Sequence, residues 1–420
     1  MHTDRPFEEL NLWQLIFAEN WEPFLDWYRT LNNYDVPDHW EENVQRMLSC
    51  GDVREGYNEY LCEDCHRTTK VGFTCKSRLC LRCFKGAVDN FLNKAKEILF
   101  EGVTHRQLVL TIPVIIRPLL QYNPELLKVF VNAGAAAIKE LVEEWRKSKR
   151  VKIGLMCVPQ LHGRSGNFNP HLHFIVSDGG VDKNGNWCNV NFFDTRKLRK
   201  KWQYHVISAL RKAIKGTVDE EKWSPVLGNM FRRYPNGFDC DAMPEKGPVE
   251  RLVVYLCKYV SSPPISIRRI ENYDGSSVTF RYEDHRKGTV RETIPAVEFI
   301  FRMIQHLPAK GFRMVRYFGI YARPVRNKIH SMVVDALNLL VETGRKIKRC
   351  FGKDNVGKTF GKSEMTCSHC GSTDMRLIRT WSKTGGMIYD AIRDDPVISQ
   401  NGKTEKAQYG KVPFQLQFAF

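Results

Sequence analysis

Apolar and polar residues alternate with two periods along this 420-residue chain, one typical of helices and one of strands. In the segment NPHLHFIVSDGG the alternation around His171 and His173 predicts a strand. Side chains two residues apart share a face of a strand, so both imidazoles should point one way while Leu172 and Phe174 point the other. Asp178-Gly179-Gly180 predicts a turn directly afterwards. Two partly exposed histidines explain the pair equally well, so the pair alone does not indicate a site.

The other periodic segments predict a mixture of helices and strands. Helices are expected over residues 1–49, 87–100, 118–149, 195–215, 248–260 and 296–307; strands over 106–114, 154–161, 171–178 and 312–320; and a hairpin over 276–294. The short loop HGRSGNFNP joins two of these strands, which favours an antiparallel or mixed sheet over a doubly wound parallel one. We therefore expect an α+β chain with four parts: a helical segment 1–49, a cysteine-rich domain 50–90, an α+β core 100–325, and a C-terminal basic helical region 326–420.

Charge narrows the class of partner. The chain carries 64 Lys and Arg against 47 Asp and Glu, a net charge of +17. This excess suits a polyanion; nucleic acid is the first candidate and an acidic membrane surface is the competing one. No run of about 18 apolar residues is present. The start, MHTDRPFEELNLW, is acidic and amphipathic, so we expect a cytoplasmic protein with no membrane partner.

Thirteen cysteines include paired CxxC motifs, which favour metal binding over disulfides in an intracellular chain. Two such pairs stand about fifteen residues apart, the spacing of a closed four-thiolate zinc site. We expect one structural zinc ion held by Cys62, Cys65, Cys80 and Cys83.

The remaining cysteines leave alternatives open. Cys50 and Cys75 can belong to a second site or replace ligands of the first. Cys367 and Cys370 form half of a knuckle pair, which would need Cys350 or His369 to complete a further site. The sequence does not decide between these uses.

A metal site built on His171 and His173 needs a third donor from the neighbouring strand. Gln160 and His162 both stand there, and either can face the ion. Downstream, PVERLVVYLCKYV places Tyr255 and Tyr259 four apart, on one face of the predicted helix. Such a pair usually packs in a core, but beside a metal ion that polarises a phosphate a tyrosine can act as a nucleophile.

Together these motifs resemble a known family. A His-hydrophobe-His strand followed by a YxxxY helix and preceded by a cysteine-rich domain is similar to the two-tyrosine HUH rolling-circle transposases, nearest to the insertion-sequence ninety-one family. The stretches LTIPVIIRPLL, KYVSSPPISIRRI, RYEDHRKGTVRET and EFIFRMIQHLPAKGFRMVRYFGIYA share this resemblance, which covers about residues 50–325.

The resemblance implies roles for individual residues. His171, His173 and Gln160 would hold a catalytic divalent ion, Mg²⁺ or Mn²⁺, while Tyr255 and Tyr259 would act as nucleophiles. The implied fold of residues 100–325 is an RRM-like HUH nuclease core around a central antiparallel sheet. Leu79 stands where many relatives have a histidine, which puts a second zinc site using that position in doubt. Asp284-His285-Arg286 fits a family pattern but receives no role.

The implied activity is DNA transposition. Each tyrosine would nick single-stranded DNA at an element end through a 5′-phosphotyrosine and rejoin it to a target, in the cytoplasm at the nucleoid, without an ATP site. Homo-oligomer formation stays open. Two alternatives remain: a replication initiator or relaxase of the same superfamily, and a non-catalytic zinc-dependent DNA-binding protein whose tyrosines pack in a core.

Overall fold

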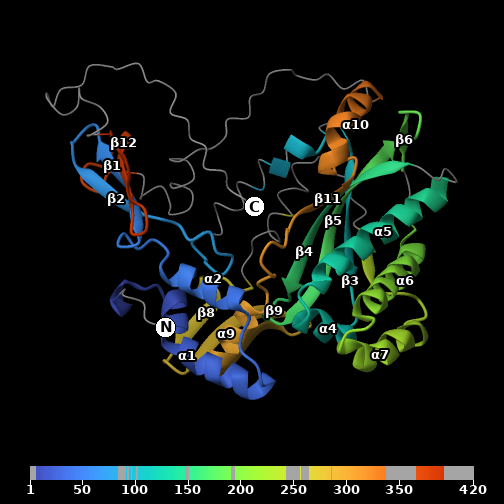
Figure 1. Ribbon diagram of the computed structural model, residues 1–420, viewed down its shortest axis with the longest axis horizontal. Coiled ribbons are helices and arrows are strands. Elements are labelled where there is room, and N and C mark those ends of the chain that lie inside the picture. Colours follow the sequence, from blue (N-terminus) through green and yellow to red (C-terminus); the bar gives the residue numbers. More distant parts are fainter. Residues whose placement is uncertain are drawn as a thin grey trace.

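The computed structural model describes residues 6–83, 91, 94–95, 97–100, 103–146, 151–190, 194–242, 256, 264–284, 286–336 and 366–391. In this part the chain combines helices with antiparallel sheets (Figure 1). The helices are α1 (Leu12–Asn32), α2 (Asp38–Leu48), α4 (Arg117–Tyr122), α5 (Leu126–Arg146), α6 (Thr195–Ile214), α7 (Asp219–Arg233), α9 (Ala296–Ile304) and α10 (Arg323–Ala336). The strands are β1 (Gly56–Cys62), β2 (Thr68–Gly72), β3 (His105–Thr111), β4 (Lys152–His162), β5 (Phe168–Val181), β6 (Trp187–Asn189), β7 (Cys240–Ala242), β8 (Ile270–Tyr273), β9 (Ser277–Asp284), β10 (Gly288–Pro295), β11 (Arg316–Gly319), β12 (Met375–Ser382) and β13 (Gly386–Asp390).

The largest sheet has the order β11-β4-β5-β3-β7, and β6 pairs with the end of β5. Each of these pairs is antiparallel. The short connection between β4 and β5 makes them neighbours, as a two-strand hairpin requires. The expected mixed helix and sheet class with an antiparallel sheet is therefore confirmed.

The two faces of this sheet belong to different cores. Leu155 and Phe174 face one way and pack in a core that also contains α5, α6 and α7 residues. Val158 and Ile175 face the other way and belong to a second core with Leu256. Strand alternation produces this division, because neighbouring residues of β5 point to opposite faces.

Two local predictions are wrong. Residues 178–180 do not form a turn, because β5 continues to Val181. Gly179 and Gly180 instead let neighbouring groups lie close to the β5 backbone. A Cβ at Gly179 would meet the Trp187 ring, and a Cβ at Gly180 would meet the Lys152 carbonyl. The helix expected over 118–149 is divided into α4 and α5, with Pro124 in the break, since proline disfavours a helical residue before it.

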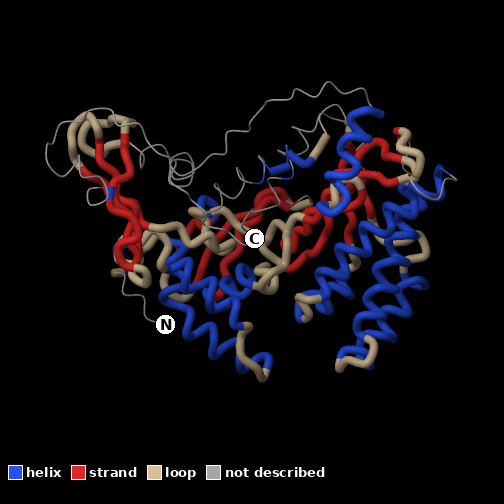
Figure 2. The backbone as a smooth tube through the Cα atoms, turned by 45° about the horizontal axis from the view of Figure 1, so that its top comes forward, coloured by secondary structure: helices blue, strands red, loops and turns tan. Residues whose placement is uncertain are grey.

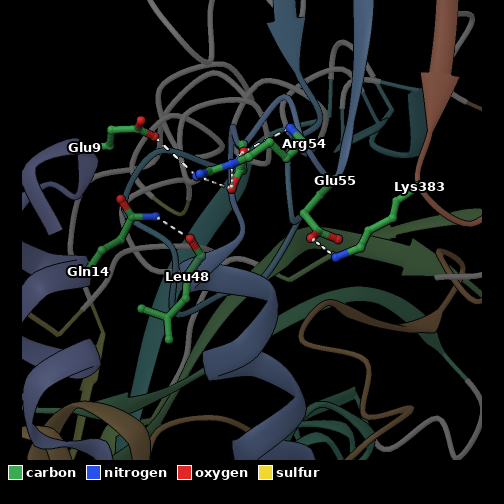
Figure 3. A network of polar contacts seen from close by, with 7 residues as sticks. Glu9, Gln14, Leu48, Arg54, Glu55 and Lys383 are labelled. Atoms are coloured by element: carbon green, nitrogen blue, oxygen red, sulfur yellow. Dashed lines mark hydrogen bonds and ion pairs between the residues drawn. The ribbon is translucent and has the colours of Figure 1, made fainter. Parts of the chain in front are cut away.

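The N-terminal helices form a core with a segment distant in sequence. Helices α1, α2 and α9 pack with the three-stranded sheet β10-β9-β8. The Trp13 and Phe299 rings lie 5.9 Å apart, joining α1 to α9. Gln14 Nε2 donates to the carbonyl of Leu48 at 3.2 Å, which ties α1 to α2 (Figure 3).

A four-stranded sheet, β13-β12-β1-β2, draws on both ends of the described chain. Figure 2 shows it at one end of the molecule, away from the largest sheet. The hairpin β12–β13 lies in a region for which only helices and a half knuckle were expected. Nothing tests the four domain boundaries, which stay a prediction. None of the described helices is both long and apolar enough to cross a membrane.

Candidate active site and metal centres

Strand register brings the three predicted ligands of the catalytic ion together. Gln160 of β4 pairs with His171 of β5, and Val158 pairs with His173. On the other side of β5, Thr111 of β3 pairs with His171. Directly paired residues share a face in an antiparallel sheet, so both histidines and Gln160 lie on the face opposite α5 and α6.

The donor atoms of these residues lie close together. The two imidazole centroids are 4.8 Å apart, and His173 Nε2 is 3.0 Å from Gln160 Oε1. His171 Nδ1 donates to the Asn169 carbonyl at 2.7 Å, which leaves the lone pair on Nε2. Two donors of an octahedral Mg²⁺ or Mn²⁺, each about 2.1 Å from the ion, lie about 3.0 Å apart. In this structure the contact is a hydrogen bond from His173 Nε2 to Gln160 Oε1, and its 3.0 Å length also equals the separation of two donors around such an ion.

Burial keeps both imidazoles neutral. Burial, together with the smaller effects of the neighbouring His171 and His162, lowers the pKa of His173 to about 3. Burial likewise lowers the pKa of His171 below its ordinary value. A metal binds the neutral form of imidazole, so both rings are in the ligating form at neutral pH.

His162, the open alternative to Gln160, lies at the end of β4 beyond a register irregularity. Its Nδ1 is 3.5 Å from Gln160 Nε2, and its ring centroid is 5.4 Å from that of His306. Gln160, in contrast, contacts His173 directly. This contact favours Gln160 over His162 as the third donor, and the ligand set stays a prediction.

The predicted nucleophiles Tyr255 and Tyr259 lie outside the described residues, as does His285 of the Asp284-His285-Arg286 stretch. Leu256, next to Tyr255, is helical and fully buried. It packs in the core that contains Val158 and Ile175, on the face that also carries the histidines.

The cysteines gather differently from the prediction. Among the described residues, two groups of four thiols could each hold an ion: Cys50, Cys75, Cys80 and Cys83; and Cys62, Cys65, Cys367 and Cys370. The prediction that Cys62, Cys65, Cys80 and Cys83 share one ion is therefore wrong.

Structural context explains the division. Cys80 and Cys83 pack with Cys50 in the core of α1 and α2, where Trp13 Nε1 donates to the Leu79 carbonyl at 3.0 Å. Cys62 lies at the end of β1, in the separate small core of the four-stranded sheet. Of the partners considered for the C-terminal pair, Cys350 lies outside the described residues, and His369 Nδ1 contacts Arg67 Nη1 at 2.6 Å.

Both groups have the properties of zinc sites. Sulfur–sulfur separations of 3.5–3.6 Å in the first group exceed the ~2.05 Å of a disulfide. Tetrahedral zinc with ~2.3 Å bonds places its sulfurs about 3.7 Å apart. In the second group, the backbone N–H groups of His369 and Cys370 lower the pKa of Cys367 to about 6, whereas the pKa values of its neighbours Cys65 and Cys370 are raised.

The comparisons with known proteins agree with these sites. Residues 154–328, which include the histidine strand, match a family model described as "Putative transposase". Residues 16–112 match the model "Transposase zinc-binding domain" of IS91-type elements. The chain belongs to the IS91 family of transposases. It is accordingly a DNA-processing enzyme with DNA as its partner and a zinc-binding domain near its N-terminus.

Curated relatives cover most of this IS91-family transposase. It is 28% identical to the transposase for insertion sequence element IS801 of Pseudomonas savastanoi pv. phaseolicola, over 74% of this chain and 78% of the relative. It is 25% identical to "Putative transposase y4qJ" of Sinorhizobium fredii, over 80% and 88% respectively. No solved structure matches the chain.

Proposed function

We propose that this transposase nicks and rejoins single-stranded DNA at the ends of its element, using Tyr255 and Tyr259 as nucleophiles. His171, His173 and Gln160 would hold a Mg²⁺ or Mn²⁺ ion beside them. Residues 100–325 would form an RRM-like HUH core, preceded by the helical and zinc-binding parts, 1–49 and 50–90, and followed by the region 326–420. The protein would act where the DNA of its host lies, at the nucleoid.

One observation carries this proposal. The helical Leu256 is buried in the core on the sheet face that bears His171 and His173. If residues 248–260 form the helix that the sequence predicts, Leu256 would anchor it on this face, and Tyr255 and Tyr259 would lie in the same layer as the histidines. A helix packed on the opposite face, against α5 and α6, could not serve the same site.

The reaction would be a transesterification. A divalent ion at the histidines supplies Lewis-acid polarisation of the scissile phosphate. The Tyr255 or Tyr259 oxygen attacks the phosphorus, forming a 5′-phosphotyrosine bond, while the P–O3′ bond breaks. The phenol proton leaves to solvent and the departing oxygen gains a proton as a free 3′-hydroxyl. Because the phosphodiester energy stays in the protein–DNA bond, rejoining reverses these steps and needs no nucleotide.

The test uses single-stranded DNA from the element ends, labelled at its 5′ side and, separately, at its 3′ side. With Mn²⁺, the full chain should form a denaturant-resistant adduct that retains the 3′-side label. Tyr255→Phe combined with Tyr259→Phe should abolish the adduct. Tyr204→Phe, which removes the same hydroxyl from an exposed position on α6, should leave it unchanged. An undiminished adduct in the double variant would refute the assignment of the nucleophiles.

A replication initiator or relaxase would perform the same cleavage on a different DNA. Challenging the protein with element ends and with an unrelated plasmid origin separates these activities, since a transposase should act on the element ends. The family match argues against the non-catalytic DNA-binding alternative. Sedimentation of the DNA complex would show whether a homo-oligomer forms.

A further inference from the structure

The second cysteine group joins two segments that lie more than 300 residues apart in sequence. Cys65 and Cys367, 302 positions apart, have their sulfurs 3.3 Å from each other. Cys62 and Cys370, 308 positions apart, have theirs at 3.5 Å. All four sulfurs lie within 4.8 Å of one another. They are too far apart for disulfides and close to the ~3.7 Å separation around tetrahedral zinc.

The two CxxC turns have the same backbone geometry. In the first, Cys62 N donates to the Arg67 carbonyl at 2.9 Å, and His66 N donates to the Cys62 carbonyl at 2.9 Å. In the second, Cys367 N donates to the Ser372 carbonyl at 2.8 Å, and Gly371 N donates to the Cys367 carbonyl at 2.9 Å.

The residue after each second cysteine has a left-handed backbone, with φ 57° at His66 and 76° at Gly371. This conformation is costly for a non-glycine residue such as His66. Two segments so distant in sequence therefore fold into a matched pair of knuckles, each presenting two thiols to the same point.

Sheet pairing extends from these knuckles. Strand β1 pairs with β12 from Gly56↔Ser382 to Cys62↔Met375. At the far end of this pairing, Lys383 Nζ lies 2.7 Å from Glu55 Oε1 (Figure 3). Glu63 forms an ion pair with Arg376 next to the cysteines. These exposed or half-buried pairs contribute about 1 kcal/mol or less each, so they orient the strands more than they stabilise them.

The apolar core of this sheet is too small to hold it together. Its buried members are Tyr60, Cys62, Val71, Cys367 and Met375. Two of these five are the cysteines themselves. Small units with so little buried apolar surface generally need a metal or disulfides, and no disulfide is present among the described cysteines.

We propose that Cys62, Cys65, Cys367 and Cys370 bind a zinc ion of their own, which fastens the 366–391 segment to the N-terminal β1–β2 hairpin. This ion is additional to one at Cys50, Cys75, Cys80 and Cys83. The match to the transposase zinc-binding domain ends at residue 112, so it does not include the C-terminal pair. The largest sheet lies between the two knuckles in sequence, so the ion would link chain segments that come before and after the candidate active site. Removing it should free one end of the chain without altering the His171 and His173 strand.

Metal analysis of the full chain tests the site, independently of DNA cleavage. Native mass spectrometry with elemental analysis should find two zinc ions per chain, and one in Cys367→Ser combined with Cys370→Ser. Cys188→Ser, outside both groups, should retain two. One zinc in the unaltered chain, two in the double variant, or iron in place of zinc would overturn the proposal. Because a single zinc ion in the unaltered chain would already overturn the proposal, the test remains informative if the double variant fails to fold.

A second experiment tests the fastening. A recognition sequence for a site-specific protease is inserted between residues 340 and 360 and cut. In zinc buffer the C-terminal fragment should stay bound through gel filtration. It should separate in the Cys367→Ser, Cys370→Ser variant. Retention in both proteins, or separation in both, would overturn the fastening role. Failure of the tyrosine adduct test would leave these results unaffected.

Discussion

The candidate active site should bind Mn²⁺ with an unusually shallow dependence on pH. Metal binds neutral imidazole, so protons compete with it below the pKa of each ligand. For a histidine with the ordinary pKa of about 6.5, the neutral fraction falls about tenfold between pH 7.5 and 5.5. Two ordinary histidines would therefore weaken binding about a hundredfold over this range.

Burial changes this expectation. A pKa of about 3 leaves His173 neutral across the whole range, so it contributes no loss. The pKa of His171 is also lowered, so its contribution is smaller than that of an ordinary histidine. Gln160 does not titrate. Because the pKa values of both histidines are lowered, their neutral, metal-binding forms persist to lower pH, and Mn²⁺ affinity should fall less on acidification. The expected loss of affinity is at most about tenfold.

The assay is a Mn²⁺ titration followed by electron paramagnetic resonance of the free ion, at pH 7.5 and 5.5. Circular dichroism at both pH values checks that the chain remains folded. His171→Ala combined with His173→Ala should remove the site and supplies the background. A weakening of about a hundredfold or more in a folded chain would contradict the buried, neutral imidazole pair.

Two further predictions concern packing. Leu256→Ala should cost about 2–5 kcal/mol of unfolding free energy in urea, as should Leu210→Ala in the opposite core, because both side chains are fully buried. The yield of tyrosine adduct is measured at a temperature where both variants are folded. It should fall more in Leu256→Ala than in Leu210→Ala, and equal yields would contradict packing of the helix around Leu256 on the histidine face. Gly319→Ala should lower the thermal midpoint more than Gly216→Ala. Both glycines have positive φ, but of the two only Gly319 has a backbone atom, the Ile153 carbonyl oxygen, where an added Cβ would lie. Gly216→Ala should cost about 1–2 kcal/mol, and an equal effect of both changes in a circular-dichroism melt would refute the close approach.

The sequence predicts local features of this fold well because short-range periodicity encodes them. Alternation around His171 and His173, with a short loop before them, predicted the antiparallel pair that places Gln160 opposite His171. Predictions failed where the partner is distant in sequence. Gly179 and Gly180 suggested a turn because nothing local shows that Trp187 and the β4 backbone approach them.

The prediction of the cysteine grouping failed for the same reason, here because the true partners lie more than 300 residues apart. Two CxxC motifs fifteen residues apart satisfy every local rule for one zinc site, yet tertiary structure gives each a different partner. Cys367 and Cys370 did carry a usable signal. A CxxC followed by glycine is suited to a knuckle that requires a left-handed residue next, and Gly371 supplies it. An unmatched knuckle of this kind indicates a missing partner pair elsewhere in the chain.

The strand β5 shows how one segment can stabilise the fold and also carry chemistry. Leu172 and Phe174 are fully buried against the helical layer, so β5 is held at the centre of the sheet. That anchoring restricts the backbone between them and thereby the direction of His171 and His173. A substitution such as Phe174→Ala should therefore affect metal binding as well as stability. Substitutions of Cys367 and Cys370 should affect only the attachment of β12 and β13 to β1. The two kinds of defect are separable because the sites lie in different sheets with different cores.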